Sequence, residues 1–264
     1  MQATPATFLA THRVFTTAEL DHALAATRQR PAATVHRLLG RWQQEGRVEQ
    51  VKRGVYVRGA DQLAGADLRA IGARLAVDAA LAYHTALEVH GLAQSVYEEI
   101  VFATRSKVAL LEFRGHRFRP VRPRAGPANS SEPLRWTEVV DHGGHEVRVT
   151  TRERTVVDVF DRPDLAGGIE EVWRSCSTLA AFDLREAREY LALVDRAILW
   201  AKVGLFLERH REELNVSSTA LDLFAQHAPK QPVYVERGVQ GRLRAPWNLI
   251  VPERWIAQEW WGDA

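Results

Sequence analysis

The sequence predicts an α+β protein with an N-terminal winged helix-turn-helix followed by a larger mixed α+β C-terminal domain. Its 264 residues suffice for two domains, and 46% hydrophobic with 26% charged residues is the composition of a folded protein. The first sixty residues are typical of short helices followed by a hairpin, whereas the remainder mixes helices, strands and hairpins. We therefore expect domains at 1–60 and 67–264, joined by a small, polar linker at about 59–66.

Two short helices are expected in the first domain. Thr16 or Thr17 can cap the first helix, because a threonine hydroxyl accepts a hydrogen bond from a free backbone amide. Pro31 suits the first position of the second helix, and Gly46 suits its end. Apolar residues of this second helix recur at i, i+3, i+4 and i+7 from Val35, so one face is expected to be buried and the other polar.

A hairpin with a cationic turn is expected after these helices. Residues 48–51 and 55–57 are β-rich, and Lys52-Arg53-Gly54 lies between them. A helix, a turn, a basic helix and a two-stranded wing follow one another in a winged helix-turn-helix, whose second helix enters the major groove of DNA. The alternative is a small helical cap whose arginines are merely solvated.

The near-neutral net charge of +2 conceals two strongly basic segments. Residues 28–58 and 101–124 each carry a net charge of +6, which leaves −10 on the rest of the chain. Such segregation predicts one or two surfaces that bind anions. The residues expected to bind DNA are Arg28, Arg30, Thr34, His36, Arg37, Arg41, Lys52 and Arg53, the last two on the phosphate backbone. A second basic surface is expected from Arg105, Lys107, Arg114, Arg117, Arg119, Arg122 and Arg124, and charge alone does not identify its partner.

Helices and strands are also expected to alternate through the second domain. Helices are expected at 68–75 and 85–90, and strands at 99–104, 113–121, 136–140, 146–149, 233–235 and 247–252. Thr150 with Glu153 forms the pattern of a capping box for the next helix. From Leu184 to Leu214 apolar residues follow a helical seam, for which core packing is favoured over a coiled-coil dimer and Gly204 is a candidate break. Three late tryptophans, Trp255, Trp260 and Trp261, predict that the C-terminus docks on its own domain or on a partner.

Catalytic signatures are scarce. His142 and His145 beside Asp141 flank a Gly-Gly turn, where ordinary turn residues are favoured over a metal site. A nuclease site built on Asp141 and Glu146-x-Arg148 lacks the lysine that such chemistry needs. Cys176 is expected to be a buried, structural cysteine. No phosphate-binding loop, serine nucleophile elbow or dinucleotide-binding glycine motif occurs in the sequence, so we expect no enzyme, no cofactor and no metal.

The first thirty residues lack the pattern of a signal peptide, and no run of about 18 apolar residues occurs. A single cysteine permits no internal disulfide. The sequence therefore predicts a cytoplasmic protein without a membrane partner.

Several motifs resemble the AbiEi-type antitoxins of abortive-infection systems, which defend bacteria against viruses. The motifs are, in order, residues 14–20, Gly46-Arg47-Val48, residues 52–57, 82–92, 149–158 and 247–252. They span most of the chain. One departure is Lys202-Val203-Gly204, where relatives tend to have Arg-Leu-Gly.

The resemblance implies a type IV antitoxin. Such a protein represses its own operon through a winged helix that binds inverted repeats in double-stranded DNA. It also counteracts a neighbouring nucleotidyltransferase-type toxin, with direct contact left open. The alternative partners of the second basic surface are then DNA, the toxin and the toxin's RNA target. Glu153, Arg154, Thr155 and Asp158 belong to a recurring segment that we interpret as structural, with Glu153 as a cap and Arg154 paired with Asp158. Two alternatives remain: a winged-helix regulator that senses a ligand or protein without any toxin, and a DNA-modifying enzyme with a winged-helix targeting domain.

Overall fold

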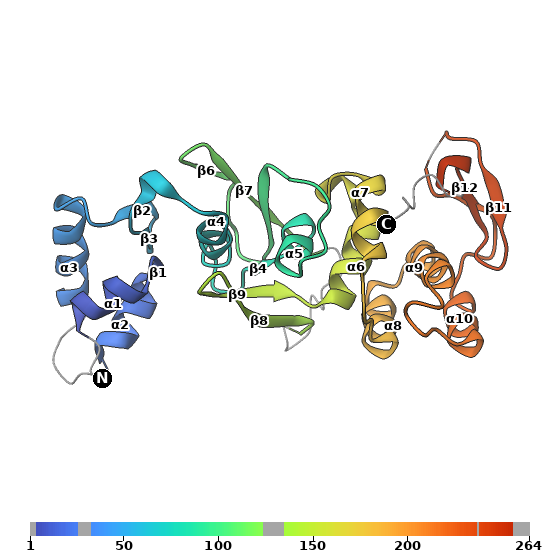
Figure 1. Ribbon diagram of the computed structural model, residues 1–264, viewed down its shortest axis with the longest axis horizontal. Helices are drawn as coiled ribbons and strands as arrows, with labels where there is room; N and C mark the ends of the chain where they lie inside the picture. The colour runs from blue at the N-terminus through green and yellow to red at the C-terminus, as the bar shows by residue number, and fades with distance from the viewer. Residues whose placement is uncertain (1–3, 26–32, 124–134, 237, 256–264) are drawn as a thin grey trace. The chain divides into compact units, whose positions relative to one another are not determined.

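Helices and small sheets alternate along the chain in the computed structural model, which describes residues 4–25, 33–123, 135–236 and 238–255 (Figure 1). The α+β class predicted from the sequence is confirmed. Two compact units make up the chain. Unit 1 comprises Met1–Leu81, Glu98–Arg122 and Glu138–Val149, and unit 2 comprises Ala82–Tyr97, Pro123–Thr137 and Thr150–Ala264. Among the described residues, no helix is both long and apolar enough to cross a membrane.

Three helices and three short strands form the beginning of unit 1. They are α1 (Pro5–Thr11), β1 (Val14–Thr16), α2 (Thr17–Ala25), α3 (Ala33–Gln44), β2 (Glu49–Lys52) and β3 (Val55–Val57). The strands form an antiparallel sheet in the order β1-β3-β2. Phe15, Leu39 and Trp42 are at most 1% exposed and lie in the core between the helices and this sheet. The expected second helix and hairpin are present, whereas α1 and β1 were not predicted.

Thr16 caps α2 through a reciprocal pair of hydrogen bonds. The Glu19 amide donates to Thr16 Oγ1 (3.1 Å), and the Thr16 amide donates to Glu19 Oε2 (2.6 Å). The carboxylate of Glu19 also accepts from Arg74 Nε at 3.0 Å. The cap therefore ties the start of α2 to a later part of unit 1.

A six-stranded mixed sheet forms the rest of unit 1, in the order β6-β7-β5-β4-β9-β8. Its strands are β4 (Ala80–Leu81), β5 (Glu99–Ala103), β6 (Leu111–Phe113), β7 (His116–Val121), β8 (Thr137–His142) and β9 (His145–Thr150). Helix α4 (Gly65–Gly72) packs against β5, because Gly72 has no side chain: a Cβ there would lie 2.7 Å from Ile100. The expected linker at 59–66 includes a short helix, η1 (Ala60–Gln62), and the start of α4. The division at residue 60 stays a prediction.

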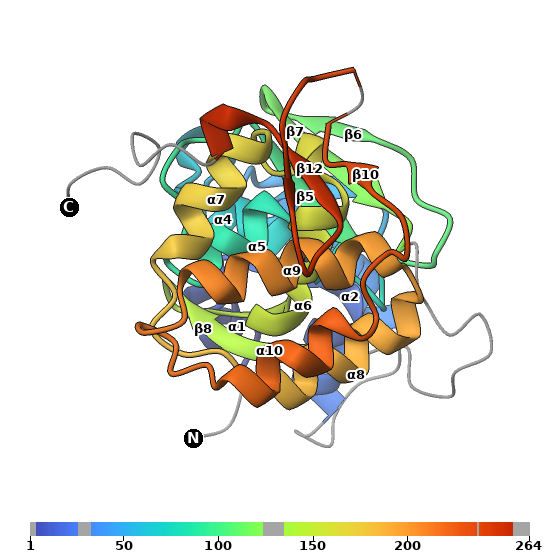
Figure 2. The same ribbon diagram turned by 90° about the vertical axis from the view of Figure 1, so that its right-hand side faces the viewer.

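Unit 2 is mostly helical, with a small sheet near its C-terminal end (Figure 2). Its helices are α5 (His84–Val89), α6 (Arg152–Asp161), η2 (Pro163–Leu165), α7 (Ile169–Ser177), α8 (Leu184–Val194), α9 (Ala197–Arg209), α10 (Ser218–Ala225) and η3 (Glu253–Trp255). Its strands are β10 (Val233–Tyr234), β11 (Arg242–Arg244) and β12 (Leu249–Val251), with β12 in the middle. Helix α6 contacts α5, α7, α8 and α9, so it forms the centre of this unit.

The long helical seam is divided at a different residue from the one expected. Asp195 adopts a left-handed conformation (φ 51°) and ends α8, and α9 starts two residues later. Gly204 instead lies inside the continuous helix α9. A Cβ at Gly204 would overlap the ring of Trp247, which is fully buried, so this glycine allows close packing.

The cap of α6 also differs from the prediction. Thr151, not Thr150, is the N-cap, and its hydroxyl accepts from the Arg154 amide at 3.4 Å. Glu153 does not cap its own helix, because its Oε1 accepts from the Asp183 amide (2.9 Å) just before α8. The carboxylate therefore joins two helices.

The expected docking of the C-terminus is confirmed for Trp255. Its ring is 3% exposed and lies 5.8 Å from that of Trp173, and its Nε1 donates to Glu236 Oε1 at 3.2 Å. Trp260 and Trp261 lie outside the described residues.

Candidate nucleic-acid interface

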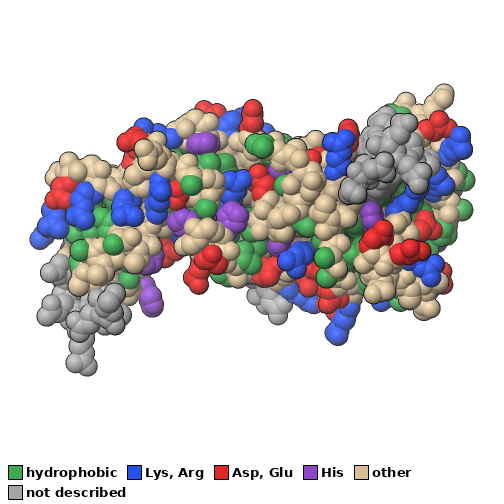
Figure 3. All heavy atoms as spheres, viewed as in Figure 1, with side chains coloured by type: hydrophobic (Ala, Val, Ile, Leu, Met, Phe, Trp, Pro, Cys, Tyr) green, Lys and Arg blue, Asp and Glu red, His purple; other side chains and the backbone are tan. Residues whose placement is uncertain are grey.

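Helix α3 presents a polar, cationic face opposite its buried one. Val35 and Leu39 are buried, whereas His36, Arg37 and Arg41 are exposed. Because these exposed residues are one to five positions apart, they share the outer half of the helix surface. Thr34 is half-buried at its edge. Figure 3 shows Lys and Arg side chains over this N-terminal part of unit 1, at the left of the view.

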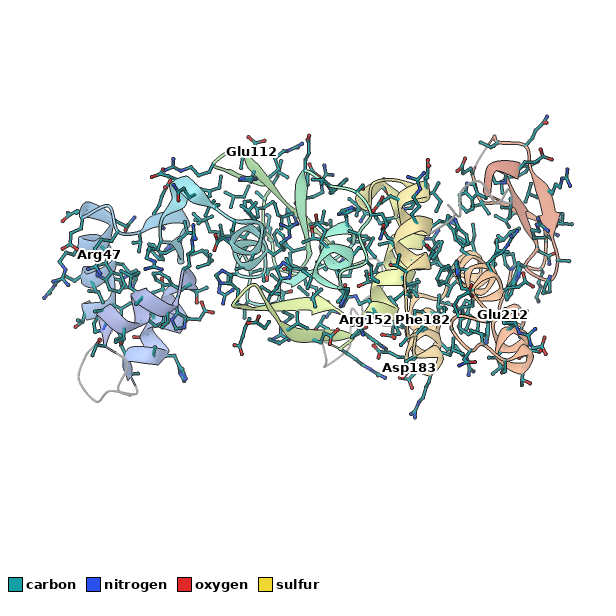
Figure 4. All side chains as sticks on the ribbon, in the orientation of Figure 1. Arg47, Glu112, Arg152, Phe182, Asp183 and Glu212 are labelled. Carbon is teal, nitrogen blue, oxygen red and sulfur yellow. The ribbon has the colours of Figure 1, made fainter. Side chains whose placement is uncertain are left out.

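Few carboxylates neutralise this face. Arg41 Nε lies 3.6 Å from Glu45, and Arg47 lies 3.5 Å from the same carboxylate. For Arg37 the described residues provide no ion-pair partner. Arg47, three residues after the end of α3 (Figure 4), also lies 5.7 Å from the centre of the Trp42 ring. Sequence reasoning counted Arg47 in the basic segment but did not assign it to the site, although its position next to Gly46 at the expected helix end was a usable signal.

The turn between β2 and β3 separates two cations that the sequence placed together. Lys52 is half-buried, and its ammonium donates to the Leu75 carbonyl at 2.8 Å. Arg53 is exposed, and within the described ranges it has no ion-pair partner. Gly54 (φ 85°) completes the turn, and its carbonyl accepts from the Thr17 amide at 2.9 Å. Arg53 is therefore the cation of this turn that is available to a ligand.

Three of the predicted site residues cannot be placed. Arg28, Arg30 and Arg124 lie outside the described residues.

The second basic surface is largely paired with carboxylates. Strand β7 lies parallel to β5, with Arg117 opposite Glu99. Arg117 and Arg119 both bind the Glu99 carboxylate, at 3.0 Å for Arg117 Nη1 and for Arg119 Nη2. Arg117 also lies 3.5 Å from Glu112 on β6 (Figure 4). Glu99 is only 8% exposed, so these two arginines offset the burial of its charge.

Arg114 is paired as well. It follows β6, and its Nε and Nη2 donate to the Glu49 carboxylate while its Nη1 lies 3.2 Å from Asp61. The hydrogen bond from Arg114 to Glu49 and the negative charge of that carboxylate raise the pKa of Arg114. Lys107 and Arg122 are exposed, and no described residue forms an ion pair with either. Arg105 is half-buried, and its amide donates to Asp78.

The His-Gly-Gly-His turn is engaged within unit 1. His145 Nε2 lies 3.0 Å from Asp67 Oδ1, and Arg13 Nε lies 3.2 Å from the other oxygen of this buried carboxylate. Asp141 accepts a hydrogen bond from the Gly144 amide across the turn. The part of the chain that the structure describes contains no group of three or more His, Cys, Asp or Glu side chains placed to hold a metal ion.

A buried polar network joins the helices of unit 2. Arg154 Nε lies 3.2 Å from Asp158, the expected i, i+4 pair, and Tyr190 donates to the same carboxylate at 2.7 Å. Burial raises the pKa of Asp158 despite these partners. The guanidinium of Arg154 also lies over the ring of Tyr190, with its Cζ 5.6 Å from the ring centre. The network holds α6 against α8.

The motif segments at 82–92 and 149–158 are in contact within unit 2. His90 Nε2 lies 2.7 Å from the Thr150 carbonyl. His84 is fully buried, stacked on Tyr97, with its ring nitrogens 3.6–3.7 Å from Glu88 and Glu171. His84 and His90 therefore contact residues of other segments of unit 2, as side chains that pack helices together do.

Two further buried groups belong to unit 2. Cys176 is fully buried, and this burial raises the pKa of its thiol, which favours the unreactive, protonated form. Burial also lowers the pKa of Lys202 to about 8, and its Nζ donates to the Phe160 carbonyl at 3.0 Å. Lys202 therefore joins α9 to the end of α6.

Comparison with known proteins finds a solved structure with a similar fold. No protein-family model matches the chain, and no curated protein matches its sequence. The fold is similar to that in a crystal structure of the RV2827C protein from Mycobacterium tuberculosis, with a TM-score of 0.56 and 12% sequence identity over 93% of this chain and 89% of that one. At this identity the likeness concerns the fold alone. Its coverage means that it extends through both units.

Proposed function

We propose that the N-terminal part of unit 1 is a winged helix-turn-helix that binds double-stranded DNA, and that the protein is an antitoxin of a type IV toxin–antitoxin system. In this role it represses its own operon and counteracts a nucleotidyltransferase-type toxin. The observation that carries the DNA-binding proposal is the exposed cationic face of α3, where Arg37 and Arg41 lie opposite a buried apolar face.

The order of the elements supports a winged helix. Helix α3 follows α2 as the second helix of the predicted pair, and β2 and β3 form a hairpin after it, with β1 as the third strand. An α-helix fits the major groove of DNA, and a wing can contact the adjacent phosphates. In this arrangement α3 is the recognition helix and the β2–β3 turn is the wing.

The available charges suit these two roles. Arginine can donate two parallel hydrogen bonds to guanine, and exposed Arg37 and Arg41 are placed for such contacts. Exposed Arg53 is placed to bind phosphate. Lys52, which the sequence also assigned to phosphate, is a poorer candidate because the Leu75 carbonyl already binds its ammonium.

The antitoxin role rests on the resemblance of the sequence motifs to AbiEi-type antitoxins. Two of those motifs, 82–92 and 149–158, contact each other in unit 2 through His90 and Thr150. If the two motifs share a structural role, they must lie against each other, and this contact meets that condition. The expected partners are operator DNA with inverted repeats and a cognate toxin, whose neutralisation by direct contact the resemblance leaves open.

DNA binding is tested by titrating the full-length protein into a labelled duplex that covers the DNA directly upstream of its gene, with a scrambled duplex as competitor. We expect preference for the upstream duplex and an affinity that falls steeply with salt. The double variant Arg37→Ala/Arg41→Ala should lose this preference. Arg185→Ala removes another exposed arginine, on α8, and is the matched control. Equal binding by the double variant and the wild type would sink the assignment.

Antitoxicity is tested by co-expression. If a nucleotidyltransferase gene adjoins this one, its expression should arrest growth, and full-length protein should restore it. DNA binding without rescue would support the regulator that has no toxin. Metal-dependent cleavage of the duplex would instead support a DNA-modifying enzyme.

A further inference from the structure

A glycine occupies the middle of the outer face of α3. Gly40 lies one turn after His36 and one turn before Gln44, and Arg37 and Arg41 are its neighbours at i−3 and i+1. Glycine is less favourable than alanine inside a helix, because it loses more backbone freedom on folding. Its presence at this position therefore needs a reason.

Packing within the protein explains glycines in other described helices. At Gly204, in α9, a Cβ would overlap the ring of Trp247, and at Gly72, the last residue of α4, a Cβ would lie 2.7 Å from Ile100. In both cases a neighbouring side chain occupies the space that a Cβ would need.

Gly40 has no such neighbour. Apart from its two chain neighbours and the backbone of its own helix, no described atom lies within 4 Å of a Cβ built there, and its φ is not positive, so alanine fits without strain. The chain therefore keeps an unfavourable residue at a position where its own structure would accept a better one. Close approach of the backbone to a bound surface is one use of a glycine that packing within the described residues does not explain.

We propose that Gly40 is the point of closest approach between α3 and DNA, and that its missing side chain sets how deeply the helix enters the major groove. This inference rests on the proposed DNA-binding function and deepens it. A side chain at residue 40 would act as a spacer between the helix backbone and the base edges. The neighbouring Arg37 would then lie too far from the groove floor to keep a bidentate contact with a base.

The experiment uses two full-length variants of increasing size, Gly40→Ala and Gly40→Gln, titrated into the upstream duplex and the scrambled duplex. Ala192→Gln, on the exposed surface of α8, is the control for a glutamine added to a helix surface. Thermal unfolding of each variant is measured in parallel.

Opposite changes in stability and affinity are expected for Gly40→Ala. Its melting temperature should rise by about 1–4 °C, because alanine is the better helix former. Its affinity for the upstream duplex should fall on the order of tenfold, the loss of one good base contact, and Gly40→Gln should fall further. Ala192→Gln should bind like the wild type.

Each outcome separates this inference from the proposed function. Wild-type affinity in Gly40→Gln, combined with weak binding by Arg37→Ala/Arg41→Ala, would overturn the role of Gly40 and leave DNA binding by α3 standing. A lower melting temperature for Gly40→Ala would also overturn it, since the glycine would then have a reason within the protein. Absence of any DNA binding by the wild type would overturn both.

Discussion

Two segments with the same net charge of +6 have different structures. In the first, Arg37 lies on an exposed helix face and the described residues give it no ion-pair partner. In the second, Arg117 and Arg119 converge on one nearly buried carboxylate, that of Glu99. Equal net charge in two segments of a sequence therefore does not mean equal charge available to a ligand.

The difference arises from the elements on which the charges lie. Residues four apart on a helix are neighbours, so the partner of an α3 arginine can come from nearby in the sequence, as with Arg41 and Glu45, the residue that follows α3. On a sheet the partner comes from the adjacent strand, which is distant in sequence, as with Arg117 and Glu99. Counting charges within one segment misses such partners.

The strongest test of this comparison is the double variant Arg37→Ala/Arg41→Ala. If both side chains read bases, affinity for the preferred duplex should fall by about 2–6 kcal/mol, since each such contact is worth about 1–3 kcal/mol. The stability of the protein should change by less than about 0.5 kcal/mol, because both side chains are exposed. Fluorescence anisotropy gives the first quantity and urea unfolding the second.

The reverse result is expected for Arg117→Ala/Arg119→Ala. Removing both arginines takes away two cations that bind the nearly buried Glu99 carboxylate, which should lower stability by about 1–2 kcal/mol in urea unfolding. Both arginines are nearly half exposed, so solvent screens part of the effect. Adding Glu99→Gln should recover part of the loss. A large loss of DNA affinity without a loss of stability would contradict the comparison.

A smaller effect separates the two cations of the wing turn. Arg53→Ala should weaken binding to all duplexes alike and reduce the slope of log affinity against log salt by about one. Lys52→Ala should leave that slope unchanged, because the ammonium binds the Leu75 carbonyl. Titrations at four or more salt concentrations measure the slope. Equal reductions in the two variants would show that Lys52 leaves its carbonyl to bind phosphate.

The smallest effect is expected for the exposed cations of the second segment. Lys107→Ala and Arg122→Ala should each change the salt slope by less than about 0.5, since neither residue belongs to α3 or to the β2–β3 turn, the elements proposed to bind DNA. The same titrations serve as the measurement. A reduction near one for either variant would extend the DNA footprint to this surface.

The sequence predicted elements whose signals are local. The helix at α3, the hairpin β2–β3 and the buried state of Cys176 followed from periodicity, turn residues and the lack of an activating neighbour. The strand β1 was missed, because three residues are too short for a periodic pattern. The pairing of Glu99 with β7 and the contact of Gly204 with Trp247 depend on long-range packing, for which one sequence carries no signal.

The division of the chain has a consequence for synthesis. Each unit is assembled from three separate stretches, so the polypeptide passes between the units five times before residue 150. Strands β8 and β9 of the six-stranded sheet are made after α5 of unit 2, and α5 packs against α6, which is made later still. While the chain leaves the ribosome, neither unit can finish folding before about half of the protein exists, and partly made apolar surfaces stay open for that time. No single cut along the gene therefore separates the two units, because a fragment that ends at residue 149 holds all of unit 1 together with two stretches of unit 2.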